Sequence, residues 1–175
     1  MLDHLAGALT EALQDEYKAR ATYRAILQRF GPVRPFANIV ESEERHIQAL
    51  LPLFARYGIP VPADRWPAQV ITPGSVAQAC QEGVQAEIEN AAMYERLLAM
   101  TADYPDVQRV FHNLQQASQQ NPLRAFQRCA ARQTLVSPEP KSHAAAGQAS
   151  QRVKASTPGC QGQGRRRRRR GRSPH

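Results

Sequence analysis

The sequence predicts an all-α fold, an antiparallel four-helix bundle made of two helical hairpins joined by a long crossover. Apolar residues recur at steps of three and four through residues 2–129, which is the spacing of one helix face. Glycines and prolines divide this stretch into four segments. The second half of the stretch also repeats the pattern of the first. We therefore expect one helical domain over residues 1–130 and no strands.

The first two helices are expected at about residues 3–30 and 35–57. Gly31 and Pro32 end the first helix, since glycine suits a helix C-terminus and proline cannot continue a helix. Gly58 and the prolines after it end the second. The connection between the two segments is short, so they should form an antiparallel hairpin.

The third and fourth helices are expected at about residues 74–101 and 104–130, again with a short connection. Proline at position 105 suits the first turn of the fourth helix. The segment 58–72 is different, because its length allows an extended reach of ~50 Å, against ~38 Å for a helix of about 25 residues. It can cross the whole bundle and set the third helix parallel to the second.

An internal repeat carries the candidate site. Glu16 precedes Tyr23 by seven residues, and Glu87 precedes Tyr94 by the same distance. The second and fourth helical segments share one spacing of residues, here called the frame. Glu and His of the second segment are replaced by Ser and Asn in the fourth. The two frames read Phe36-x-x-Ile39-x-x-x-Glu43-x-x-His46 and Phe111-x-x-Leu114-x-x-x-Ser118-x-x-Asn121.

Four ionisable residues of this repeat fall in the apolar stripes of three helices: Glu16, Glu43, His46 and Glu87. Burying such charges without partners costs several kcal/mol each. A divalent cation is the usual reason for carboxylates to converge in an apolar interior. We therefore expect a metal site, with a metal-free, hydrogen-bonded core network as the alternative.

These motifs resemble the ferritin-like superfamily, with rubrerythrins as the nearest well-known branch. The stretch from Tyr17 to Cys129 is most similar to an uncharacterised domain-of-unknown-function branch. The resemblance implies a ferritin-like bundle with a non-haem di-iron or related carboxylate site, and activities such as iron oxidation or peroxide reduction. By resemblance, Glu16 and Glu87 match the terminal carboxylates. Glu43 matches a bridging carboxylate, and His46 matches a terminal imidazole.

The half-site on the fourth helix departs from that pattern. Ser118 and Asn121 stand where the family has Glu and His, and both are weak neutral ligands. Pro122 also removes a backbone donor in mid-helix and favours a kink. We therefore expect one metal ion rather than two, iron first, with manganese or zinc also suited to oxygen-rich ligation with one imidazole. Whether the protein is an enzyme stays open; an enzyme of this kind would be a weak non-haem metal oxidoreductase acting on iron, oxygen or peroxide.

Tyr23 and Tyr94 lie two helical turns from the carboxylates of their own segments. One interpretation is catalytic, in which they hydrogen-bond a ligand carboxylate or lie on an electron path. The other makes them core aromatics with a satisfied hydroxyl, which is commoner.

Cys80 and Cys129 fall toward the same end of the predicted bundle and are candidates for a disulfide. A reducing compartment favours two buried free thiols instead. The chain begins directly with an amphipathic helix and has no run of about 18 apolar residues, so we expect a cytoplasmic protein without a membrane partner.

Charge separates the chain into two parts. Residues 1–129 carry 12 Lys and Arg against 14 Asp and Glu, whereas residues 130–175 carry 11 against one. We expect residues 131–175 to be a disordered tail, since their composition buries little apolar surface. The run from Arg165 to Arg170 suits nonspecific nucleic-acid binding; it also resembles high-GC sequence translated in another frame.

Three functions therefore stand side by side. The first is a ferritin-like metal-binding protein with weak redox activity. The second is a metal-free degenerate bundle that serves as a structural or interaction module. The third is a protein associated with nucleic acid through its tail. A second copy of the chain is a further candidate partner.

Overall fold

The computed structural model describes residues 2–120 and 122–136. Over these residues the chain is helical and contains no strand, so the predicted all-helical fold is confirmed for this part. The first three predicted helices match the observed ones to within two residues. The elements are α1 (Leu2–Phe30), α2 (Phe36–Tyr57), the short 3-10 helix η1 (Trp66–Ala68), α3 (Val76–Met100), α4 (Pro105–Gln120) and α5 (Pro122–Val136).

Where the sequence predicts one helix over 104–130, the structure describes α4 up to Gln120 and α5 from Pro122, and residue 121 between them lies outside the described residues. Along these two helices the buried face passes from Ser118 to Pro122 and then Phe126. The predicted inward position of Asn121 lies outside the described residues.

α5 continues to Val136, beyond the predicted end of the domain at residue 130. Its last turns keep a buried contact with the rest of the fold through Cys129. The remainder of the expected tail, residues 137–175 with Arg165 to Arg170, lies outside the described residues.

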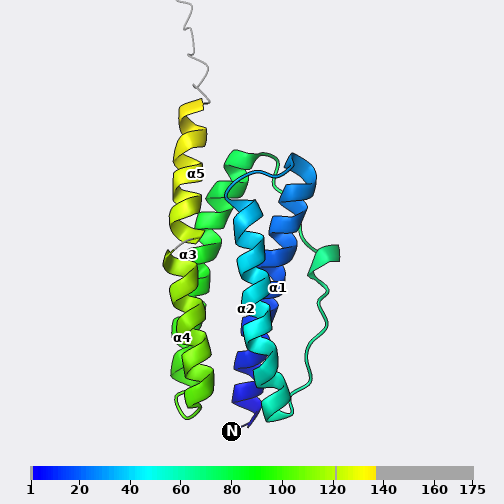
Figure 1. The fold of residues 1–175 in the computed structure, drawn as a ribbon, viewed down its shortest axis with the longest axis vertical. Helices are drawn as coiled ribbons and strands as arrows, with labels where there is room; N and C mark the ends of the chain where they lie inside the picture. The colour runs from blue at the N-terminus through cyan, green and yellow to red at the C-terminus, as the bar shows by residue number, and fades with distance from the viewer. Residues whose placement is uncertain (1, 121, 137–175) are drawn as a thin grey trace, which may run out of the picture. The chain divides into compact units, whose positions relative to one another are not determined.

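The helices lie side by side along the long axis of the molecule (Figure 1). α1 packs against α2, and α3 packs against α4, α5 and α1. Residues 31–35 make the short connection from α1 to α2. In Figure 1 the long segment 58–75, here called the crossover, runs from the end of α2 along α1 to the start of α3.

The ends of α2 and α3 follow from local chemistry. Gly58 ends α2 in the left-handed conformation with a φ of 63°. The N–H of Ile59 then donates to the carbonyl of Phe54 at 2.9 Å, which satisfies a backbone carbonyl of the last turn. At the start of α3, the Ser75 hydroxyl accepts a hydrogen bond from the N–H of Gln78 at 3.1 Å, as in a helix N-cap.

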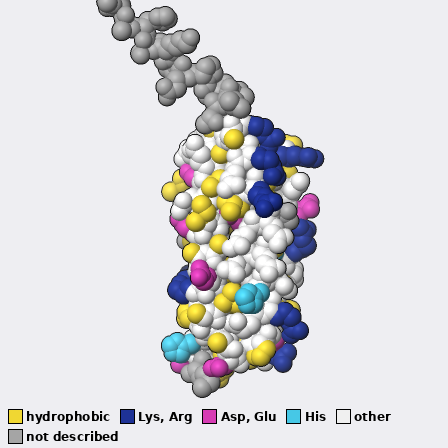
Figure 2. Space-filling model, turned by 90° about the vertical axis from the view of Figure 1, so that its left-hand side faces the viewer, with side chains coloured by type: hydrophobic (Ala, Val, Ile, Leu, Met, Phe, Trp, Pro, Cys, Tyr) yellow, Lys and Arg dark blue, Asp and Glu magenta, His cyan; other side chains and the backbone are white. Residues whose placement is uncertain are grey.

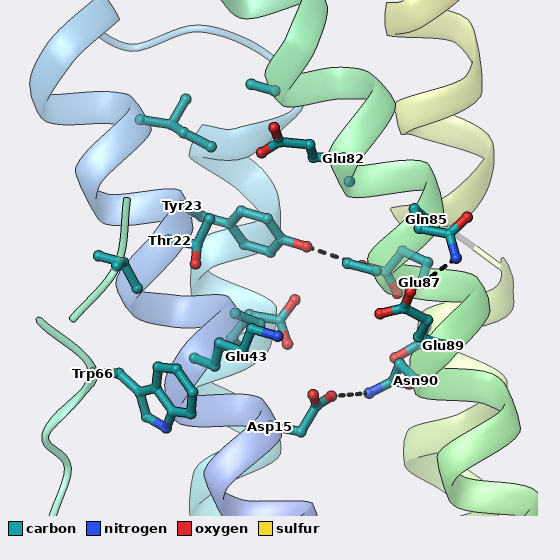
Figure 3. Close-up of a pocket in the computed structure, with 18 of the residues that line it drawn as sticks. Asp15, Thr22, Tyr23, Glu43, Trp66, Glu82, Gln85, Glu87, Glu89 and Asn90 are labelled. Carbon is teal, nitrogen blue, oxygen red and sulfur yellow. Dashed lines mark hydrogen bonds between the residues drawn. The ribbon is translucent and has the colours of Figure 1, made fainter. Parts of the chain in front are cut away.

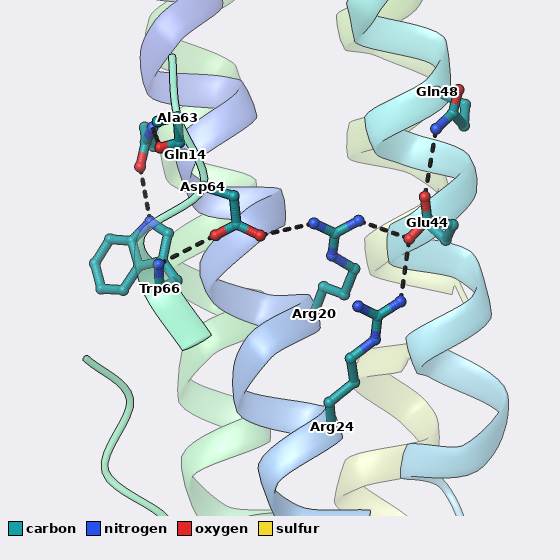
Figure 4. Close-up of polar contacts among 8 residues, drawn as sticks. All are labelled: Gln14, Arg20, Arg24, Glu44, Gln48, Ala63, Asp64 and Trp66. Carbon is teal, nitrogen blue, oxygen red and sulfur yellow. Dashed lines mark hydrogen bonds and ion pairs between the residues drawn. The ribbon is translucent and has the colours of Figure 1, made fainter. Parts of the chain in front are cut away.

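Side-chain hydrogen bonds join the middle of the crossover to α1 (Figure 4). The indole N–H of Trp66 donates to Oε1 of Gln14 at 2.8 Å. Asp64 accepts a hydrogen bond from Arg20 at 2.7 Å, and the same guanidinium donates to Glu44 of α2 at 2.6 Å. One largely buried arginine therefore joins α1, α2 and the crossover.

The buried side chains form two apolar clusters with a polar layer between them. One cluster includes Leu13, Leu50, Tyr94 and Leu97, and the other includes Tyr23, Phe36, Cys80 and Phe126. Where the two clusters meet lie five buried polar residues, here called the polar layer: Glu16, Glu43, His46, Glu87 and Ser118.

No described helix is both long enough and apolar enough to cross a membrane.

Candidate metal centre

Three of the four predicted ligands converge in the polar layer. Glu16 of α1 and Glu43 and His46 of α2 are 1%, 4% and 7% exposed. Each offers a ligand atom, and these atoms all lie within 4.8 Å of one another. Glu43 and His46 reach the same point because residues three apart share a helix face. Two carboxylates and one imidazole are a donor set that suits iron, manganese or zinc.

The imidazole of His46 lies between the two carboxylates. Its Nδ1 is 3.1 Å from Oε2 of Glu16 and 3.1 Å from Oε2 of Glu43. Burial alone lowers the pKa of His46, but the hydrogen bonds and negative charges of the two glutamates outweigh it and raise this pKa to about 10. Without a metal ion, His46 is therefore a cation at neutral pH.

The two carboxyl groups respond to this cation differently. Burial raises the pKa of Glu16, yet the hydrogen bond and charge of His46 leave it below its ordinary value. The pKa of Glu43 is raised well above its ordinary value, chiefly by burial and then by the nearby charge of Glu16. In the metal-free cluster, the His46 cation thus pairs with the Glu16 carboxylate, and burial favours proton binding at Glu43.

Glu87 is buried from α3 but lies outside the group of three. Burial, followed by the charge of Glu16, raises its pKa to about 8. The structure therefore places all four predicted residues in the same interior layer and brings three of them within ligand distance of one another.

Both repeat tyrosines donate hydrogen bonds to glutamates of this layer. Tyr94 of α3 donates to Oε1 of Glu16 at 2.7 Å. Tyr23 of α1 donates to Oε1 of Glu87 at 3.3 Å (Figure 3). Each hydroxyl thus reaches the glutamate of the other helix, which fits both the core interpretation and the role of orienting a ligand carboxylate.

On the fourth segment, Ser118 is buried at 3% exposed and lies at the cavity that also reaches Glu43 and Glu87. The site therefore has a neutral hydroxyl where the internal repeat has the carboxylate of Glu43.

Sequence reasoning missed two polar residues beside the site. Asn90 follows Glu87 by one turn on the buried face of α3, and its amide donates to Asp15 of α1 at 2.8 Å. The sequence offers a signal, since 83, 87, 90 and 94 follow the helical step of three and four. The core stripe of this segment therefore includes Asn90 rather than the neighbouring Ala91.

The expectation of two free thiols is wrong for the structure, in which Cys80 and Cys129 form a disulfide with Cα atoms 5.8 Å apart. The two cysteines meet because Phe126 and Cys129 lie on the buried face of α5, which packs against α3.

The fold and the cluster define an all-helical protein with a buried Glu–Glu–His group able to hold a metal ion. No protein-family model matches the chain, and no curated protein matches it. Among solved structures, the chain is similar to the hypothetical protein MJ0754 from Methanococcus jannaschii DSM 2661, with a TM-score of 0.66 and 26% sequence identity. The match covers 74% of this chain and 81% of that chain. Because that protein is described as hypothetical, the likeness adds a related fold and no activity.

Proposed function

We propose that this protein binds one divalent metal ion, iron first, inside a ferritin-like four-helix bundle. The observation that carries the proposal is the convergence of Glu16, Glu43 and His46 within 4.8 Å in the interior. Two carboxyl groups so close together repel when both are ionised, and burial makes their charge more costly. A divalent cation offsets both costs with the ligands already in place.

Glu87 is the candidate fourth ligand, although it lies outside the group of three. It points into the same layer from α3, and Tyr23 already orients its carboxyl group. With Ser118 on the fourth segment, only one carboxylate-rich half-site remains. This favours one metal ion over two.

The ferritin-like assignment is supported by the repeat and by the connections. Two helix pairs with short connections, joined by one long crossover, are a known bundle topology with metal sites on facing helices. A bound iron would supply one-electron redox chemistry toward oxygen or peroxide. The chain's own residues hold the ligands in place, with Tyr94 on Glu16 and apolar clusters on both sides of the layer.

The test is a loading experiment on the full chain. Chelator-treated protein is loaded anaerobically with ferrous iron, and in parallel with manganese and zinc, then desalted and assayed for metal and protein. We expect about one ion per chain, as a single half-site would hold. About two ions would contradict the single-metal proposal. No ion in a protein that is folded by circular dichroism would favour the metal-free scaffold.

Two variants locate the bound ion. Glu43→Gln and His46→Gln each remove one ligand atom while preserving side-chain size, and both should abolish loading. Glu41→Gln is the matched control, because Glu41 is exposed on the same helix two residues away. Equal loading in all three variants would place the ion elsewhere.

One observation supports a second candidate function, which is nucleic-acid association. Arg124, Arg128 and Arg132 are exposed at steps of four along α5, just before the basic tail. Figure 2, which views the left-hand side of Figure 1, shows Lys and Arg side chains gathered on the upper part of that side. Full-length chain should bind DNA with a strong salt dependence, and replacing Arg165 to Arg170 with glutamine should reduce the slope. Salt-independent binding would exclude this function.

A further inference from the structure

A cavity of about 420 Å³ lies between α1 and α3, with the crossover along it (Figure 3). Its lining includes Glu43 and Glu87 of the polar layer, and Trp66, Val70 and Ile71 of the crossover. Ile71 is 90% exposed, so the cavity is bordered by a residue at the surface. This volume is at the lower end of the range of about 300–1,000 Å³ typical of small-molecule sites.

Acidic groups outnumber basic groups in the lining of the cavity. It carries five carboxyl groups and a single ammonium group, which belongs to Lys18. The Lys18 ammonium lies 5.8 Å from the centre of the Trp66 ring, where the electron-rich face attracts it. Even when Glu43 and Glu87, whose pKa values are raised, hold protons, the three other carboxyl groups outnumber the single ammonium group, so an anionic ligand would be repelled and a cation attracted. The carboxyl groups are those of Asp15, Glu43, Glu82, Glu87 and Glu89.

One polar group in the lining lacks a partner. Asn90 is only 9% exposed, and its amide nitrogen donates to Oδ2 of Asp15 at 2.8 Å. Its carbonyl oxygen Oδ1 is buried and has no hydrogen-bond partner in the described part of the chain. A buried acceptor without a donor is costly, so a ligand that brings an N–H group to this point would be favoured.

We propose that this cavity binds a small organic cation, an ammonium group carried on a short aromatic or aliphatic body. The ammonium donates to Oδ1 of Asn90 and to Asp15, and the body packs against Trp66 and Ile71. An inorganic ion would leave the apolar part of the lining uncovered. The acidic groups that converge within ligand distance are those of the metal cluster, and Asp15 is not among them. The proposal does not require a bound metal, because Asn90, Asp15 and Trp66 are not proposed ligands.

Trp66 gives a direct readout, since it is the chain's single tryptophan and lines the cavity. The full chain is titrated with 2-phenylethylamine, 2-phenylethanol and 3-phenylpropionate, which share an aromatic body and differ in charge, while tryptophan fluorescence is recorded. We expect a saturable response to the amine at a Kd at least about tenfold below those of the other two probes. A response that does not saturate by about 10 mM, or equal affinity for the three probes, would overturn the proposal.

Two variants test the placement of the ligand. Asn90→Ala removes the unpaired acceptor, and we expect the amine to bind about tenfold more weakly. Asn113→Ala is the control, because Asn113 is exposed on α4 and does not line the cavity. Ala86→Leu narrows the cavity from an exposed lining position and should also weaken binding without threatening the core. Unchanged affinity in both Asn90→Ala and Ala86→Leu would overturn the proposal.

Metal content, measured in the same samples, separates this proposal from the metal site. Amine binding by a chain that takes up no metal would support the cavity proposal and contradict the metal proposal. A metal-loaded chain with no response to the amine would support the metal proposal and contradict the cavity proposal.

Discussion

The hydroxyl of Tyr94 on α3 donates a 2.7 Å hydrogen bond to Oε1 of Glu16 on α1. Its repeat counterpart, Tyr23 on α1, donates to Glu87 on α3 at 3.3 Å. The repeat thus appears in the structure as a reciprocal pair of contacts between α1 and α3, although the fourth segment carries Ser118 in the frame where the second carries Glu43. We infer that Tyr94 orients Glu16 for the metal and stabilises its charge without one.

Replacing Tyr94 with phenylalanine should destabilise the metal-free protein more than replacing Tyr23. Tyr94 donates to an ionised carboxylate, since the pKa of Glu16 is lowered. Such a bond contributes about 1.5–3 kcal/mol. Tyr23 makes a longer bond to Glu87, whose raised pKa of about 8 keeps it protonated at neutral pH, so Tyr23→Phe should cost at most about 1 kcal/mol. Urea unfolding at pH 7 measures both. A larger loss for Tyr23→Phe would contradict this account of the two hydroxyls.

The metal-free protein should lose stability as pH rises through the neutral range. The pKa of Glu87 is raised from 4.5 to about 8, and that of His46 from 6.5 to about 10. A group whose folded-state pKa is raised binds more protons folded than unfolded, so its stabilisation is complete below the unfolded pKa and is lost as pH rises to the folded one. Both groups act together from about pH 6.5 to 8, each with a slope of at most about 1.4 kcal/mol per pH unit.

Unfolding of chelator-treated protein by urea at several pH values measures this slope. Glu87→Gln cannot titrate, so its profile should be flatter between pH 5 and 8 than that of the wild type. Glu95→Gln on the exposed face of α3 should leave the profile unchanged. Stability that rises with pH over this interval would contradict the assigned protonation states.

The disulfide between Cys80 and Cys129 should make stability depend on reductant. It closes a loop with a sequence separation of 49 residues, so its reduction should cost about 4 kcal/mol. Chain isolated without reductant and unfolded should show about one free thiol, because the sequence has three cysteines. A double Cys80→Ser, Cys129→Ser variant should not respond to reductant. Three free thiols would show that Cys80 and Cys129 are reduced and would contradict the disulfide.

The crossover should loosen when Arg20 is replaced. Its guanidinium joins Glu44 of α2 to Asp64 of the crossover and is largely buried, with 13% of the side chain exposed. Arg20→Gln should speed amide hydrogen exchange at residues 64–68, because it removes the ion pair that joins Asp64 of the crossover to α1. Arg24→Gln is the control, since Arg24 is exposed and its contact with Glu44 is 3.4 Å. Equal exchange in the two variants would show that Arg20 does not hold the crossover.

Much of the helical layout could be predicted from the sequence. Gly31 and Gly58 stop helices by an intrinsic conformational preference, so the bounds of α1 and α2 follow from local chemistry. The burial of Glu16, Glu43, His46 and Glu87 also follows from the helical step, which is a local property.

The remaining features depend on packing between distant segments. The pairing of Cys129 with Cys80, for example, depends on how α5 lies against α3. The contact of Asn90 with Asp15 joins residues 75 positions apart and creates part of the cavity lining. No periodicity within one helix predicts such a contact.

The most direct test of the metal site is the position of the ion itself. Crystals of the full chain loaded with ferrous iron would be measured at the iron absorption edge, and an anomalous map would be calculated. We predict one peak per chain among Glu16, Glu43 and His46, at about 2.0–2.2 Å from a carboxylate oxygen and the imidazole nitrogen. An iron peak at any other place, or none in crystals grown from iron-loaded protein, would contradict the account.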